Sequence, residues 1–337
     1  MTTPAGPARR VWNPTVPLAL RLAYASLVAN TLIVLTGGAV RLTGSGLGCP
    51  TWPRCTEQSF VPHGELGIHG LIEFGNRLLT YVLVAVAVAT WVAVWRLTER
   101  RGRRARDEWA SPSATSRTGR RSLRRIATLL ALGIPAQAVI GGVTVLTDLN
   151  PWVVALHLMV SMGLISGSVL LMHRLREGDA VPIRTVRPAM SRLVRCTYLL
   201  VWVVLYLGTV VTGSGPHAGD RDSPRNGLDP QIWSHAHAAA VYGLVGLTVA
   251  CLVVARNSGA PAPVVRCVGW LLGLELAQGV VGVVQYTTGL PTPLVWVHLF
   301  GASLLVAAAT ELLLQTRPHT YTAAPINPEQ HAGASRP

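Results

Sequence analysis

The chain carries an internal repeat, and this repeat restricts it to folds that contain the same unit twice. Residues 136–164 read AQAVIGGVTVLTDLNPWVVALHLMVSMGL, and residues 277–305 read AQGVVGVVQYTTGLPTPLVWVHLFGASLL. The two segments align without a gap at a spacing of 141 residues, and eleven of their 29 positions are identical. The identical pairs include Gln137 with Gln278 and His157 with His298. Because polar residues match as well as apolar ones, we interpret the pattern as a duplicated structural unit.

The repeated segments belong to apolar runs that are long enough to cross a membrane, which takes about 20 residues of helix. Half of the 337 residues are hydrophobic, 13% are charged and the mean hydropathy is +0.40, so we expect a polytopic membrane protein. The polar, proline-rich start of the chain does not resemble a cleavable signal peptide. The expected spans are Leu18–Val40, Ile68–Trp95, Ile126–Leu146, Trp152–Met172, Cys196–Val211, Gln231–Val254, Cys267–Tyr286 and Leu294–Leu314.

The eight runs form two sets of four, which predicts an all-α protein made of two pseudo-symmetric four-helix bundles. The loops after the first and fifth runs share the sequence TGSG, at residues 43–46 and 212–215. An even number of spans in each half gives a parallel repeat about an axis along the membrane normal. The expected segments are a disordered tail at 1–17, an N-terminal bundle at 18–173, a linker at 174–195, a C-terminal bundle at 196–314 and a tail at 315–337.

All 29 basic residues are arginines, and their distribution predicts the orientation of the spans. If both termini are cytoplasmic, the inside segments hold 24 arginines and the outside loops hold four, which are Arg41, Arg54, Arg221 and Arg225. This bias agrees with the positive-inside rule. It also accounts for the net charge of +14 without a nucleic-acid partner.

Four histidines lie at one depth near the outer ends of their spans. His157 and His298 occupy equivalent positions of the repeat, roughly 9 Å below the outer turns, and His235 and His237 begin the sixth span. A single such residue fits an interfacial hydrogen bond to a carbonyl, but a repeated pair inside a membrane is costly and indicates function. Imidazole is a common axial ligand of haem iron, so opposed histidines in a bundle predict a bis-imidazole haem site.

The second span carries a polar cluster within HGLIEFGNRLLT. Glu73 and Asn76 share a helix face, and Arg77 lies one turn beyond Glu73. A carboxylate at this depth either takes part in chemistry or pairs with Arg77. His69, one turn outward, is expected at the interface. Arg41 and Arg77 flank the outer end of this half, where cations suit haem propionates or lipid headgroups.

Two cysteines, Cys49 and Cys55, lie in the first outside loop, GSGLGCPTWPRC. On the oxidising side of a membrane their expected state is a structural disulfide. The alternative is a reversible dithiol that carries electrons. Cys196, Cys251 and Cys267 lie in spans or near the reducing face and are expected to be inert.

Together these residues resemble the haem A synthase family. The resemblance rests on LTGSGLGCPTWPRC, IEFGNR, LHLMVS and VHLFGA, and it covers residues 18–314. It implies an oxidoreductase that converts the C8 methyl of haem O to a formyl group, making haem A for cytochrome c oxidase. It implies a haem b in the C-terminal half, ligated by His298 and by His235 or His237. In the N-terminal half it implies a substrate haem on His157, with Glu73 as the catalytic residue.

The chain departs from the family pattern at Asn76, where the family usually has histidine. Asparagine is a weak iron ligand, so three arrangements stay open: His157 alone, His157 with His69, or His157 with a water held by Asn76. A loose alignment of the TGSG loops matches Asn76 with His235, and His237 is its rival. Two residues apart on a helix point about 200° apart, so only one of them faces the core.

This asymmetry between the halves predicts their roles. A histidine stands opposite His298, whereas Glu73 and Asn76 stand opposite His157, so we expect the reaction in the N-terminal half and electron transfer in the C-terminal half. The expected location is a bacterial plasma membrane, with both sites near the extracytoplasmic face. The expected partners are lipid, haem O and its synthase, an electron acceptor and, as a further option, a second copy of the chain.

Two other functions fit the layout less well. A dihaem b-type cytochrome that only transfers electrons needs four good axial ligands, and it gives Glu73 no task. A transporter is expected to have broken helices and a polar site at the midplane. The polar residues of this chain gather near one face instead.

Overall fold

The computed structural model describes residues 13–107, 114–177, 181–183, 186–317 and 319–321. Eight of its helices are long and apolar enough to cross a membrane, which confirms the expected all-α polytopic fold. The helices are α1 (Val16–Leu42), α2 (Gly67–Asp107), α3 (Ala114–Leu146), α4 (Pro151–Glu177), α5 (Pro188–Ser214), α6 (Pro230–Asn257), α7 (Ala262–Thr287) and α8 (Thr292–Gln315). A short 3₁₀ helix, η1 (Gly64–Leu66), precedes α2, and β1 (Val181–Ile183) pairs antiparallel with β2 (His319–Tyr321).

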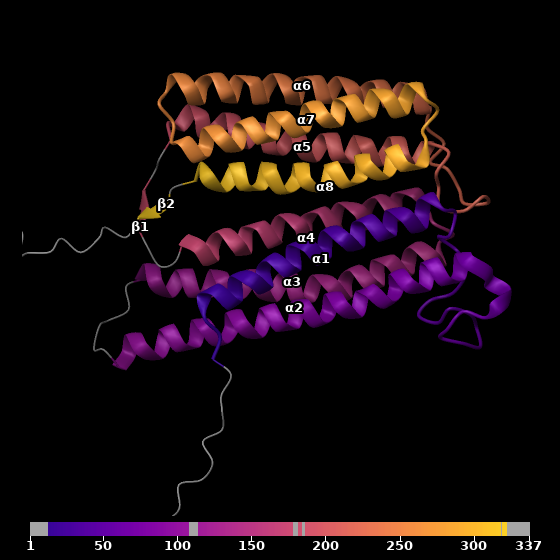
Figure 1. Cartoon of the computed structure of the whole chain (residues 1–337), viewed down its shortest axis with the longest axis horizontal. Coiled ribbons are helices and arrows are strands. Elements are labelled where there is room, and N and C mark those ends of the chain that lie inside the picture. The colour runs from indigo at the N-terminus through magenta and orange to yellow at the C-terminus, as the bar shows by residue number, and fades with distance from the viewer. Residues whose placement is uncertain (1–12, 108–113, 178–180, 184–185, 318, 322–337) are drawn as a thin grey trace, which may run out of the picture.

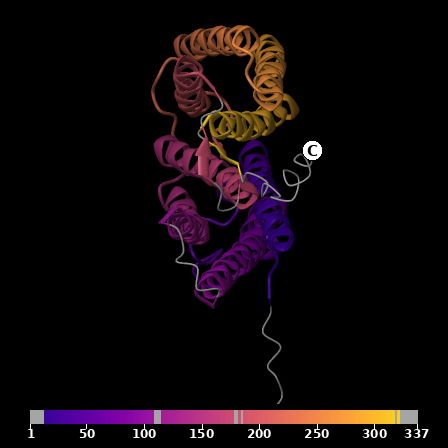
Figure 2. The ribbon, with the colours of Figure 1, turned by 90° about the vertical axis from the view of Figure 1, so that its left-hand side faces the viewer.

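The helices form two bundles that lie side by side, α1 to α4 in one and α5 to α8 in the other (Figures 1 and 2). Within each bundle, consecutive helices pack against each other and the fourth closes the ring against the first. The second and fourth helices of a bundle therefore face each other diagonally across its core. We call the end that carries the loop between α1 and α2 the disulfide end, and the opposite end the termini end.

The repeat extends to the backbone of the two hairpin turns, α3 to α4 and α7 to α8. Leu149 and Leu290 both adopt the left-handed conformation, each with φ of 60°. Their amides donate to the carbonyls of Thr144 at 2.8 Å and Gln285 at 2.7 Å. Because this conformation is costly for leucine, its recurrence at matched positions indicates that the duplicated sequence keeps a duplicated structure.

The seam between the bundles is formed mainly by α8 against α4 and α1, and by α5 against α4. In the repeat, α1 corresponds to α5 and α4 corresponds to α8, so the contact of α1 with α8 is equivalent to that of α5 with α4. The pseudo-symmetry axis therefore runs parallel to the helices, between α4 and α8. Trp296 of α8 donates from Nε1 to the carbonyl of Leu35 in α1 at 2.8 Å. Ser166 of α4 and Thr310 of α8 join their hydroxyls at 2.9 Å.

The arginine-rich segments expected between spans are helical over most of their described length. Helix α2 continues to Asp107 and α3 begins at Ala114, while α4 continues to Glu177 and α5 begins at Pro188. Hydropathy marks the part of a helix that lies in lipid, but arginine is itself a good helix former, so the helices extend beyond the apolar runs. Of the expected tails, residues 1–12 and 322–337 lie outside the described residues.

Candidate functional site

The core of the C-terminal bundle brings two histidines face to face. His237 of α6 and His298 of α8 lie on diagonally opposed helices, and their ring centroids are 6.5 Å apart at an interplanar angle of 73°. Metal–imidazole bonds are about 2 Å long, so two rings that ligate one metal from opposite sides have centroids about 6 Å apart. The separation of these rings therefore fits a single metal ion between two imidazoles.

A hydrogen bond from the neighbouring helix fixes the tautomer of His237. Its Nδ1 lies 3.0 Å from the carbonyl oxygen of Val204 in α5. A carbonyl only accepts, so Nδ1 carries the hydrogen and Nε2 of the neutral ring keeps its lone pair. Metal-binding histidines usually donate their other ring nitrogen to a carbonyl or carboxylate in this way. This arrangement also fits the chemistry of an axial haem ligand.

His235, the other histidine of this pair, has a different environment. The residue is exposed, and its ring lies 6.4 Å from the ring of Tyr286. The geometry brings His237, and not His235, to His298. The choice between them therefore follows from which side of α6 faces α8.

The repeated histidines, His157 and His298, share the same surroundings at Nδ1. In each ring, Nδ1 is buried and makes no hydrogen bond among the described residues. Each ring also faces a glycine of the preceding helix: a Cβ on Gly141 would lie 3.2 Å from Cε1 of His157, and one on Gly282 would lie 3.7 Å from Cε1 of His298. Small residues at these two positions leave room for each ring, and buried nitrogens without partners are what a bound group would engage.

Gln137, the other polar residue of the repeat, fixes the backbone that carries His157. Its Nε2 donates to the carbonyl of His157 at 2.9 Å and to the hydroxyl of Ser161 at 2.5 Å. The equivalent Gln278 packs against Gly301 instead. Among the described residues, the amide of Gln137 is thus bonded to the backbone of its repeat histidine, and no such bond is formed by Gln278.

In the N-terminal bundle, Asn76 of α2 takes the place that His237 holds in the other half. Asn76 packs against Gly37 of α1 in the way that His237 packs against Gly208 of α5. The Asn76 Oδ1 accepts a hydrogen bond from Thr36 at 2.7 Å. Its side chain is therefore anchored to α1, on the helix diagonally opposite His157.

Glu73 lies one turn closer to the disulfide end, and only 5% of its surface is exposed. Its Oε2 accepts from the amide of Cys49 at 2.6 Å, and its Oε1 accepts from Nη2 of Arg77 at 2.5 Å. Arg77 also donates to the carbonyls of three loop residues, Cys49, Thr51 and Arg54. The carboxylate and the guanidinium thus tie the loop between α1 and α2 onto the mouth of the first bundle.

The same loop contains the disulfide between Cys49 and Cys55, as expected. His69 is bound to it rather than to the core, since its Nδ1 lies 2.8 Å from the hydroxyl of Ser45. His63, a residue of the same loop, has its Nε2 3.5 Å from the hydroxyl of Thr56. The structure therefore brings Glu73 and Arg77 together and leaves His69 at the rim.

Arg41 lies at the seam between the two bundles. Its Nε donates to the carbonyl of His217 at 2.7 Å, and its Nη2 donates to that of Thr212 at 3.2 Å. The sequence did not indicate His217, whose Nε2 donates to the carbonyl of Leu290 at 2.9 Å. No local pattern marks such a residue, because its partner lies far away in the chain.

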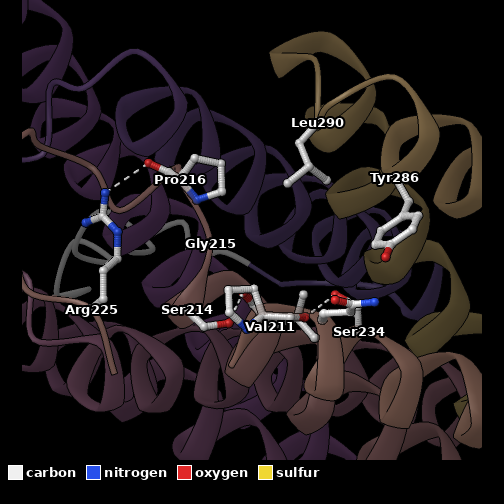
Figure 3. Close-up of a pocket in the computed structure, with 10 residues that line it drawn as sticks. Val211, Ser214, Gly215, Pro216, Arg225, Ser234, Tyr286 and Leu290 are labelled. Carbon is white, nitrogen blue, oxygen red and sulfur yellow. Dashed lines mark hydrogen bonds between the residues drawn. The ribbon is translucent and has the colours of Figure 1, made fainter. Parts of the chain in front are cut away.

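A cavity of about 600 Å³ opens at the disulfide end of the C-terminal bundle (Figure 3). Its walls come from α5, α6, α7 and the loop between α5 and α6, and its lining residues include Ser214, Arg225, Ser234, Tyr286 and Leu290. Ser234, which lines the cavity, lies about one helical turn from His237 on α6. Arg225 is held at the rim by the carbonyls of Ser223 at 2.8 Å and Pro216 at 3.1 Å.

Comparison with known proteins gives one family. The model of the family described as "Cytochrome oxidase assembly protein" (COX15-CtaA) matches residues 20–219, which include Glu73, Asn76 and His157. Curated relatives named heme A synthase are 28% identical over 200 residues in Bacillus pumilus, 32% over 142 in Lysinibacillus sphaericus and 35% over 68 in Geobacillus thermodenitrificans.

These alignments cover 56%, 42% and 20% of this chain, and 58%, 39% and 20% of the relatives. The matched regions thus span less than two thirds of each relative's length. The family match, by contrast, covers more than half of this chain. The chain therefore belongs to the COX15-CtaA family of cytochrome oxidase assembly proteins.

Proposed function

We propose that this protein is a haem A synthase, an oxidoreductase that converts the C8 methyl of haem O into a formyl group. The observation that carries the proposal is the difference between the two cores. One core has two histidines at the separation of a bis-imidazole metal site, and the other has one histidine opposite an amide and a carboxylate. In a protein that only transferred electrons, a histidine opposite an amide and a carboxylate would have no function.

In the C-terminal half, His237 and His298 would hold a b-type haem as its two axial ligands. Such a haem supplies one-electron transfer when it is bound. Val204 keeps Nε2 of His237 free to bind iron, and Gly282 leaves space beside His298. The protein's task here is to fix two imidazoles at one distance, so that the cofactor carries the redox chemistry.

In the N-terminal half, His157 would hold the substrate haem while Gln137 fixes its backbone. Glu73 would act on the substrate methyl as a general base or by orienting water. Arg77 holds the carboxylate in one orientation, and the loop with Cys49 and Cys55 covers it. Asn76 offers an amide in place of a second strong iron ligand, which leaves the face opposite His157 accessible to water. Arg77 at this mouth and Arg41 at the seam are cations of the kind that suit haem propionates.

The same proposal includes the surroundings of the enzyme. The arginine bias would set both termini in the cytoplasm of a bacterium and both sites near the extracytoplasmic face. Haem O would arrive through the membrane from its synthase, and electrons would leave through the C-terminal haem to an acceptor. A second copy of the chain is a further candidate partner.

The test is purification from a host that makes haem O, followed by an optical spectrum and mass analysis of the extracted pigment. The proposal predicts a bis-imidazole b-type spectrum together with hydroxylated or formylated haem. Two b-type haems that never yield a modified haem would support the electron-transfer cytochrome instead. A colourless protein would overturn both haem functions.

A further inference from the structure

One face of α7 carries a stripe of polar and small residues toward the core of the C-terminal bundle. The stripe consists of Glu275, Gln278, Gly282 and Gln285, whose spacing of three, four and three residues places them on one side of a helix. Gly282 faces the ring of His298, and Gln278 packs against Gly301 of α8. The stripe therefore runs along the core from the middle of the bundle past His298 toward the disulfide end.

Three oxygen atoms on this stripe are buried without a hydrogen-bond donor among the described residues. They are Oε2 of Glu275, Oε1 of Gln278 and Oε1 of Gln285. Glu275 is only 2% exposed and has one described donor, the hydroxyl of Thr248 in α6, which lies 2.8 Å from Oε1. Buried polar atoms in folded proteins are almost always satisfied by protein, ligand or water. Three acceptors in a row on one face therefore indicate ordered water or a ligand along α7.

The fold itself does not require the carboxylate of this stripe, as a comparison of the two halves shows. The equivalent positions of α3 are Ile134, Gln137, Gly141 and Thr144. Ile134 is a buried apolar residue where the C-terminal half has Glu275. The same hairpin therefore forms without a carboxylate at this position. Glu275 is thus a feature of the C-terminal half that its equivalent in the N-terminal half lacks.

Among the residues that the structure describes, no cation forms an ion pair with Glu275. On α6, the titratable group that interacts with Glu275 is Cys251, whose thiol lies 3.5 Å from the hydroxyl of Thr197. On α8, the titratable groups are His298 toward the disulfide end and Glu311 toward the termini end, and Glu311 pairs with His173. A carboxyl in such a setting, within a membrane, is expected to serve an ion or proton function.

The end of the stripe near the disulfide end lies next to the cavity described above. Tyr286 and Leu290, which follow Gln285 on α7 and its turn, line the cavity at the disulfide end (Figure 3). Along α7, Gln285 precedes the cavity-lining Tyr286, Gln278 lies about two helical turns further into the bundle, and Glu275 lies nearly one turn beyond Gln278. This order is that of a hydrated path from the end of the bundle to its middle.

We propose that the α7 stripe conducts protons and that Glu275 takes up one proton when the haem site in the core of the same bundle gains one electron. This inference rests on the proposed b-type haem at His237 and His298. Glu275 changes from carboxylate to carboxylic acid as the iron changes from ferric to ferrous, so the charge of the region stays constant. The proton comes from water in the cavity, and the electron comes from the methyl carbon of the substrate. When a one-electron carrier removes the electron, Glu275 returns the proton along the same path.

The test is a redox titration of the C-terminal haem in the purified protein at a series of pH values, using an electrode and mediators. Because the reduced state binds the extra proton, the potential is expected to fall as pH rises, by up to about 59 mV for each tenfold change in proton concentration. In Glu275→Gln, the haem is expected to bind normally and its potential to lose this dependence. Glu311→Gln makes the same chemical change near the termini end and is expected to keep it.

An infrared difference spectrum between the reduced and oxidised states gives a second readout. The parent is expected to show the band of a newly protonated carboxylic acid, and Glu275→Gln is expected to lack it. If Glu275→Gln does not fold, Thr248→Val, which removes the described donor to Glu275, is expected to shift the pH range of the dependence. A haem that binds with a pH-independent potential in the parent, or a dependence that survives Glu275→Gln, would overturn this inference alone. A parent without any bis-imidazole haem would overturn both this inference and the proposed function.

Discussion

At the scale of single residues, the decisive feature is the direction in which two neighbouring histidines of α6 point. His237 is fixed by Val204 and faces His298, whereas His235 is exposed beside Tyr286. We predict that His237→Ala abolishes b-type haem binding in the C-terminal half and that His235→Ala leaves it intact. The measurement is haem bound per protein after purification, and the opposite pattern would rule out this ligand assignment.

Glu73 gives the second prediction at this scale. Replacing it with glutamine keeps the shape of the side chain and removes the charge that accepts from Cys49 and Arg77. General acid–base groups contribute about 10²–10⁴-fold to rates, so Glu73→Gln is expected to reduce haem A formation by about that factor. The C-terminal haem spectrum serves as the internal control and is expected to be unchanged. Full product formation in Glu73→Gln would exclude a chemical role for this carboxyl.

The sequence predicted some of these residues and not others, for a physical reason. His157 and His298 recur in a repeat, and Glu73 is a charged residue inside an apolar run, so one-dimensional patterns identify them. The choice between His235 and His237 depends on a carbonyl of α5, and Gln137 acts on a backbone atom 20 residues away. Such contacts exist only after the helices have packed.

At the scale of elements, the loop between α1 and α2 depends on one side chain. Arg77 donates to three loop carbonyls and to Glu73, although it is itself part of α2. Removing a partner from buried polar groups costs about 1–3 kcal/mol for each group. We therefore predict that Arg77→Leu lowers the free energy of unfolding by on the order of 3 kcal/mol.

The measurement for this loop is thermal unfolding in detergent, combined with the rate at which a water-soluble reductant opens the Cys49–Cys55 bond. Both unfolding and reduction are expected to become easier in Arg77→Leu. Arg54→Leu is the matched control, since Arg54 lies in the same loop and, among the described residues, its side chain contacts the Glu57 carbonyl and the Phe60 ring. Equal effects of the two changes would contradict the role given to Arg77.

The bounds of the helices show which features hydropathy patterns predict and which they miss. The hydropathy runs predicted all eight spans, because lipid exposure requires continuous apolar length. They underestimated the ends of α2, α3, α4 and α5, where arginines continue the helix beyond the apolar run. The left-handed leucines of the two turns also have no signal in the sequence, since glycine or asparagine is usual there.

At the scale of the whole molecule, orientation follows from charge. The loops of the disulfide end carry few arginines, and the segments of the termini end carry many. We predict that a periplasm-dependent reporter is active when it is inserted in the loop between α5 and α6, and inactive when it is fused after α8. Activity only in the fusion after α8 would indicate the opposite orientation in the membrane, with the disulfide loop in the cytoplasm.

The two bundles share a backbone plan and differ in their cores, which is the central claim about the molecule. The N-terminal half has Glu73 and Asn76 opposite His157, and the C-terminal half has His237 opposite His298 with Glu275 below it. We infer that duplication produced two haem-binding bundles and that the different polar residues in their cores give them different functions. One half would then perform the oxidation and the other would remove its electrons.

The most direct measurement of this division compares His157→Ala with His298→Ala in a host that makes haem O. For each variant, the b-type spectrum and the extracted haem products are measured on the same sample. The account predicts that His157→Ala keeps the bis-imidazole spectrum but forms no hydroxylated or formylated haem, whereas His298→Ala loses that spectrum. If His157→Ala still yields modified haem, or if His298→Ala keeps the b-type spectrum, the assignment of the two halves is contradicted.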